Sequence, residues 1–140
     1  MSARRGTEAR LTSPLQPYPG PVPVRLVPLP QREYEAVCAR IDAGEPQSQD
    51  LRAATKHLLA LLAAKAPGHS VEVRVPPYAA VQVVAGARHA RGTPPAVVEL
   101  DAQTWIALAR GAVTWSDAAA QGRIHASGER SDLSQWLPVG

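Results

Sequence analysis

The spacing of apolar residues divides the chain into a helical part and a part built of strands. Over 31–65 the apolar positions recur every three to four residues, which is the spacing of one face of an α-helix. The pattern predicts a helix over 31–43 and a second over 49–65, in which Ser48 is the expected N-cap and Asp50 complements the helix dipole. The second helix is amphipathic, so we expect its apolar face to lie on a sheet.

The apolar period changes to two after the second helix. This alternation predicts strands over 70–75, 79–84 and 96–100, each with one apolar face. Pro76 and Pro77 end the first strand, because a tandem proline cannot donate to a β-ladder. Together these segments predict three neighbouring strands with one face covered by helices.

The stretch 101–128 turns the chain twice within a short distance. Asp101 is the expected cap of a helix over 102–110. Ser116 is the expected cap of a second short helix, and Gly122 is its expected end. Glycine at such an end can adopt the left-handed conformation that stops a helix.

The last part of the chain predicts one strand and one helix. Residues 123–127 alternate apolar and polar side chains, as a strand does. Ser131 is the expected cap of a final helix that contains Leu133, Trp136 and Leu137. The predicted order is helix, helix, three strands, two helices, strand and helix, which is an α+β arrangement.

Residues 1–30 differ from the rest because they hold half of the 14 prolines, which fix φ and remove backbone donors. We expect 1–13 to be disordered and 14–30 to be an extended arm along the domain surface. A proline-rich ligand for the groove of a partner protein is the alternative. Residues 31–140 are expected to form a single domain, since compact domains commonly contain about 100–150 residues.

Charge and cysteine content limit the classes of function. The net charge of +3 is spread along the chain, which argues against nucleic-acid binding. Cys38 is the single cysteine, so an intramolecular disulfide is excluded and a cytoplasmic protein is expected. No apolar run resembles a secretory signal, and the longest, 58–64, is too short to span a bilayer. A transient contact with a membrane surface remains open.

The chemistry-bearing residues show no catalytic or metal-binding spacing. The histidines lie in four different segments, at His57, His69, His89 and His125. We therefore expect no metal and no cofactor, and a His57 that is partly exposed or locally hydrogen-bonded. Asp101 and Asp117 stand where helix caps and first-turn acids belong. The sequence predicts a protein that is not an enzyme.

One basic segment has a candidate binding role. The turn between the second and third predicted strands contains Arg88, His89 and Arg91. Arginine presents a planar fork of donors that suits an anionic headgroup. A solvated loop is the alternative, because exposed arginine is common.

Three motifs in the stretch 101–128 resemble the C-terminal half of sterol carrier protein domains. They are TWIALARG (Thr104 to Gly111), SDAAAQG (Ser116 to Gly122) and GRIHASG (Gly122 to Gly128). The segment from Ser70 to Asp101 is similar to an actinobacterial branch of this family. The resemblance covers about residues 31–137.

The resemblance implies a five-stranded, highly twisted mixed sheet covered on one face by helices, with an apolar tunnel between the two layers. It implies non-catalytic binding or transport of a fatty acyl chain, a sterol or a similar lipid. The residues expected to line or plug this cavity are Val81, Val83, Trp105, Leu108, Trp115, Ala118, Ile124 and Trp136.

Two other functions remain open. The polar segment 129–132 and the proline-rich arm favour an interaction or accessory protein that keeps the fold without a usable cavity. Similar domains are also fused to mycothiol-dependent, maleylpyruvate isomerase-like enzymes, so an accessory role in such a system is a remote alternative. The sequence identifies no protein partner.

Overall fold

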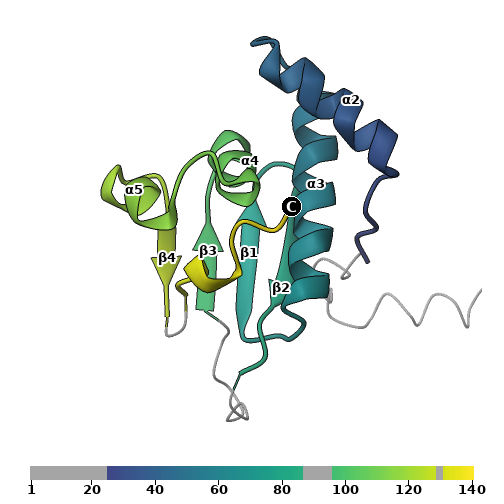
Figure 1. Ribbon diagram of the computed structural model, residues 1–140. Coiled ribbons are helices and arrows are strands. Elements are labelled where there is room, and N and C mark those ends of the chain that lie inside the picture. Colours follow the sequence, from purple (N-terminus) through teal and green to yellow (C-terminus); the bar gives the residue numbers. More distant parts are fainter. Residues whose placement is uncertain (1–24, 87–95, 129–130) are drawn as a thin grey trace, which may run out of the picture.

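The computed structural model describes residues 25–86, 96–128 and 131–140 (Figure 1). Most of the predicted N-terminal arm lies outside these residues. So do all three candidate headgroup contacts, Arg88, His89 and Arg91.

The described residues form an α+β fold whose elements follow nearly the predicted order. The elements are α2 (Gln31–Asp42), α3 (Ser48–Lys65), β1 (Val71–Val75), β2 (Ala79–Val83), β3 (Ala96–Glu99), α4 (Ala102–Arg110), α5 (Trp115–Ala120), β4 (His125–Ser127) and the short 3₁₀ helix η2 (Ser134–Trp136). The predicted final α-helix is wrong, because only η2 forms there. Leu137 is extended, at φ −112° and ψ 145°, as expected for a residue before Pro138.

The sheet is mixed, with the strand order β2-β1-β3-β4. β1 pairs antiparallel with β2 and parallel with β3, and β4 pairs antiparallel with β3. The chain runs along β1, returns along the antiparallel β2 at the edge of the sheet, and then enters β3 on the other side of β1. The two central strands, β1 and β3, are therefore parallel to each other. The resemblance implies five strands, and the described residues contain four.

Among residues 25–86, 96–128 and 131–140, the helices cover one face of the sheet, as predicted. Val71, Val73 and Val75 of β1 have no exposed surface, and Val83 and Val98 on the neighbouring strands complete this apolar face. On the opposite face of β1, Arg74 is exposed and Glu72 is partly exposed. The alternation of β1 thus matches a half-buried strand.

Three segments cover the apolar face: α3, α4 and the C-terminal residues 131–140. α3 packs against both β2 and α4. The C-terminal segment crosses the sheet toward α3 (Figure 1), and its Leu133 is fully buried. Val139 N donates to Ala109 O, and Lys65 Nζ donates to Pro138 O. The C-terminal segment is therefore part of the helical layer.

α3 is buried on more than the apolar face that was expected to lie on the sheet, because α2 also packs against it. His57, which lies on α3, has 5% of its surface exposed. Its Nδ1 accepts a hydrogen bond of 2.9 Å from Leu29 N, and its ring stacks on Tyr34 with 3.9 Å between centroids. Leu26 and Leu29 pack on the core, so the last residues of the predicted arm lie against the domain. His57 is hydrogen-bonded, as expected, but it is buried and its partner lies 28 positions away in the sequence.

The environment of His57 predicts a pH-dependent stability. Burial lowers the pKa of His57 below its ordinary value of 6.5. As the pH falls through that value, the unfolded chain takes up a proton that the folded protein does not. The free energy of unfolding is therefore expected to fall as the pH is lowered through the interval below about 6.5, as measured by urea denaturation.

His57→Asn is the variant that tests this assignment, because it can accept from Leu29 N without titrating. We expect it to flatten the pH dependence in that interval. His125→Asn, at an exposed position on β4, is the control and should keep the wild-type slope. An unchanged slope in His57→Asn would show that another group is responsible.

Two of the predicted helix caps are shifted along the chain. α3 begins at Ser48, so Gln47 and not Ser48 is its N-cap residue, and Asp50 Oδ2 accepts from Gln47 N. At α5 the cap is Thr114 and not Ser116: Thr114 Oγ1 accepts from Asp117 N at 3.1 Å. Trp115 packs against the core as the first residue of α5, which leaves Thr114 in the extended cap conformation.

Paired substitutions distinguish these two caps. Thr114→Ala is expected to lower the free energy of unfolding by about 1 kcal/mol, because an N–H at the start of α5 loses its acceptor. Ser116→Ala should have an effect close to zero. Urea denaturation of the two variants measures the difference, and equal losses would contradict the assignment.

Candidate functional site

The predicted apolar residues all join one hydrophobic core. Val83, Trp105, Leu108 and Ala118 are buried. The partly buried members that pack against the same core are Val81, Trp115, Ile124 and Trp136. The structure therefore brings together residues from β2, α4, α5, the approach to β4, and η2. Which of them contact a ligand stays a prediction.

Trp105 is the largest fully buried side chain of this core, with 1% of its surface exposed. Its Nε1 donates to the carbonyl of Thr55 at 3.3 Å, so the indole links α4 to α3. α4 begins after Asp101, at the predicted position, and ends at Gly111, whose φ of 83° is the left-handed conformation of a helix stop. Thr104 Oγ1 also donates to Asp101 Oδ1. These contacts hold Trp105 inside the layer between helices and sheet.

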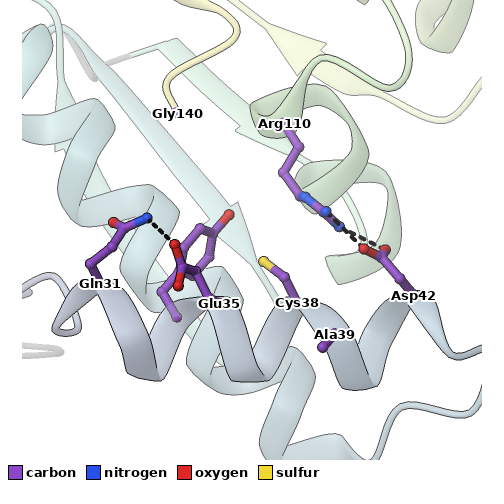
Figure 2. Close-up of a pocket in the computed structure, with 8 residues that line it drawn as sticks. Gln31, Glu35, Cys38, Ala39, Asp42, Arg110 and Gly140 are labelled. Carbon is purple, nitrogen blue, oxygen red and sulfur yellow. Dashed lines mark hydrogen bonds and ion pairs between the residues drawn. The ribbon is translucent and has the colours of Figure 1, made fainter.

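A surface cleft of about 430 Å³ lies between α2 and the end of α4 (Figure 2). Its lining residues are Gln31, Tyr34, Glu35, Cys38, Ala39, Asp42, Arg110 and Gly140. Figure 2 shows the Gln31–Glu35 pair at one end, the Asp42–Arg110 pair at the other, and Cys38 between them. None of these residues was predicted to belong to a site.

Two charged groups of this cleft, Asp42 and Arg110, form an ion pair with each other. The two terminal nitrogens of Arg110 each lie 3.0 Å from one oxygen of Asp42. This bidentate contact lowers the pKa of the Asp42 carboxyl and raises that of Arg110. Burial, followed by the neighbouring Cys38 thiol, raises the pKa of the Tyr34 phenol. The cleft therefore contains a neutral phenol and a satisfied ion pair.

A second cavity of about 330 Å³ lies between the end of β2 and η2. We call it the η2 cavity, and its lining residues are Val84, Ala85, Asp132, Gln135 and Trp136. Sequence reasoning found only Trp136. Ala85 and Gln135 follow no apolar period that would assign them to a cavity, and the cavity joins segments about fifty positions apart in the sequence.

The side chains that could ligate a metal are dispersed in the described parts of the chain. Within residues 25–86, 96–128 and 131–140, no three His, Cys, Asp or Glu residues could hold an ion together. Asp117 lies in the first turn of α5, as predicted, where its backbone N–H meets Thr114. None of the helices described is both long and apolar enough to cross a membrane.

Comparison with known proteins identifies the family. Residues 47–139 match the family described as bacterial SCP ortholog, where SCP denotes sterol carrier protein. This match begins just before α3 and ends in the C-terminal segment, so it contains the whole sheet and its cover. No curated protein matches the chain significantly. The match covers most of the chain, and the protein belongs to the bacterial sterol carrier protein-like family.

Proposed function

We propose that this protein binds or carries an apolar ligand, such as a fatty acyl chain, a sterol or a similar lipid, without catalysing a reaction. Membership of a sterol carrier protein-like family carries the proposal. The ligand would lie between the apolar face of the sheet and the layer formed by α3, α4 and the C-terminal segment. We also propose that the complete sheet has the five strands that the family resemblance implies.

The composition of this layer supports the proposal. The inward-facing positions of β1 are all valine, and those of α4 include Trp105 and Leu108. Such a lining favours apolar ligands, because it offers few partners for polar groups. Trp105, Leu108 and Ala118 are almost fully buried, so uptake of a ligand requires the helical layer to move away from the sheet.

Native mass spectrometry of freshly purified protein, followed by solvent extraction, tests the proposal. We expect a bound lipid, or saturable binding of a fluorescent acyl probe after the lipid is removed. The heat-unfolded protein is the control for nonspecific uptake. A protein that neither releases a lipid nor binds the probe would contradict the proposal.

The second candidate function is that of an interaction or accessory protein with the same fold. The burial of Trp105 favours it, because its indole occupies space between the helices and the sheet, where the proposed ligand would lie. In that case, removal of the indole would create a binding site that the wild-type protein lacks. The two functions therefore differ in the expected effect of Trp105→Ala on probe binding.

The absence of catalysis and the cytoplasmic location are parts of the same proposal. The single Cys38 suits a reducing compartment. Stoichiometric zinc in the native protein would argue against a non-enzymatic function and for the mycothiol-dependent alternative. Headgroup binding by Arg88, His89 and Arg91 remains a prediction about residues outside those described.

A further inference from the structure

α2 touches two of the segments that cover the sheet, although it does not belong to that layer itself. It packs along α3. The Asp42–Arg110 ion pair joins its C-terminal end to the end of α4 (Figure 2). The family match begins at residue 47, after α2. α2 therefore lies outside the matched part of the chain and bridges two helices of the layer under which the ligand is proposed to lie.

α2 is fixed on α3 at two separate points. Near the C-terminal end of α2, Arg40 Nε lies 2.8 Å from the carboxylate of Asp50, which is buried at the start of α3. Near its N-terminal end, the ring of Tyr34 stacks on His57 of α3. Val37, between these points, is buried. Because the two contacts lie at opposite ends of α2, they fix its direction on α3.

The attachment of α2 to α4 is different in kind. A cleft of about 430 Å³ lies between the two helices, and the ion pair of Asp42 with Arg110 bridges it at one end (Figure 2). Both of these side chains are partly exposed, 60% for Asp42 and 31% for Arg110. Exposed ion pairs contribute little to stability and are weakened by salt. This bridge can therefore open while the buried core stays intact.

We propose that α2 acts as a clasp on the helical layer, and that the Asp42–Arg110 pair opens when the apolar ligand enters or leaves. This inference rests on the proposed function, and it adds a control over the rate of ligand exchange. Asp42 is held on α3 through α2, so the end of α4 can move away from α3 only when the pair opens. The pair is closed before entry and after it, so its loss should speed binding and release alike and leave the affinity unchanged.

Stopped-flow fluorescence with the neutral apolar probe N-phenyl-1-naphthylamine tests this control. Asp42→Ala removes the acceptor of the pair, and Arg110→Gln removes its charged donor. Each variant is expected to raise the association and dissociation rates of the probe by roughly 1.5- to 5-fold at low salt, with an unchanged Kd. The effect is small because Trp105 still links α4 to α3. The double variant should be no faster than the single ones, since both substitutions open the same pair.

Salt provides a test that needs no substitution. An increase in ionic strength from about 0.01 M to about 0.5 M screens the exposed pair, so probe exchange in the wild-type protein should become faster. Asp42→Ala has no pair to screen, and its rates should change less. The probe is uncharged, so screening does not alter its encounter with the protein.

Two variants control for effects that do not involve the clasp. Glu72→Gln removes the carboxylate of another exposed ion pair, that of Glu72 with Arg74 on the uncovered face of the sheet. Thr114→Ala removes the cap of α5 and lowers stability without touching α2. Both variants should exchange the probe at the wild-type rate.

The possible results separate this inference from the proposed function. If the probe binds, but Asp42→Ala and Arg110→Gln exchange it at the wild-type rate, the clasp is wrong and apolar binding stands. The same conclusion follows if Thr114→Ala speeds exchange as much as they do. A wild-type protein that neither binds the probe nor carries a lipid would show that both proposals are wrong.

Discussion

Trp105→Ala is expected to lower the free energy of unfolding by about 3–5 kcal/mol, the usual loss when a fully buried large aromatic side chain is removed. The indole is the largest fully buried side chain in the described part of the chain, and it links α4 to the carbonyl of Thr55. Its removal leaves a cavity beside the apolar face of the sheet and removes this hydrogen bond. Urea denaturation measures the loss.

The same variant decides how Trp105 relates to ligand binding. If the indole fills the space that a ligand needs, Trp105→Ala should bind more of a fluorescent acyl probe than the wild-type protein does. If it forms the wall of a ligand cavity, probe binding should decrease together with stability. Unchanged binding would place Trp105 outside the ligand site.

Trp115→Ala is the matched control for these measurements. Trp115 is partly buried at the start of α5, so its removal should destabilise the protein less than the removal of Trp105. An equal or larger loss of stability in Trp115→Ala would contradict the assignment of Trp105 as the main buried anchor.

Gly68→Ala is expected to have the second large effect, a loss of roughly 2–5 kcal/mol in the free energy of unfolding. A Cβ atom at position 68 would lie 2.2 Å from the carbonyl carbon and oxygen of Val84. These are backbone atoms, and Val84 is held on both sides: its N–H donates to Ala66 O, and its carbonyl accepts from Ser70. The clash therefore cannot be relieved by rotating a side chain.

Gly122→Ala is the control that measures the cost of a positive φ alone, without a steric clash of the added Cβ. Gly122 also has a positive φ, 72°, but a Cβ there would meet no atom within 4 Å. Its substitution should lower the free energy of unfolding by only about 1–2 kcal/mol, because only the left-handed backbone is strained. Similar losses at both positions would show that the close approach to Val84 is unimportant.

Gly68 also illustrates a role that the sequence suggests only in part. The Pro67–Gly68 pair predicts the end of α3, and α3 does end at Lys65. Nothing nearby in the sequence indicates that Val84, which adopts a positive φ of 68°, approaches Gly68. This contact exists because β2 pairs antiparallel with β1 and brings residue 84 back to the start of that strand.

The candidate site was predictable in its apolar members and not in its polar ones. Val83, Trp105 and Leu108 stand at regular periods within their elements, so their burial follows from local geometry. Asp132 and Gln135 lie in a segment where the expected helix is replaced by a 3₁₀ turn. Pro138 prevents a helix from continuing through this segment. The path of the segment is set by its hydrogen bonds to α3 and α4.

The sequence by itself determined the kind and order of the elements from α2 to β4, the covered face of the sheet, and the family resemblance that residues 47–139 confirm. These features depend on the spacing of apolar residues, every two residues in a strand and every three to four in a helix, and on the residues that end each element. Both are local properties of the sequence.

Tertiary structure decided the cap of α5, the burial of His57 and the pairing of Arg110 with Asp42. It also brought Trp136 and Asp132 together with the end of β2 around the η2 cavity. His57 meets Leu29 across 28 positions of sequence, and Arg110 meets Asp42 across 68. Such pairs are set by how packed layers meet, because no local period specifies which side chains face one another across an interface.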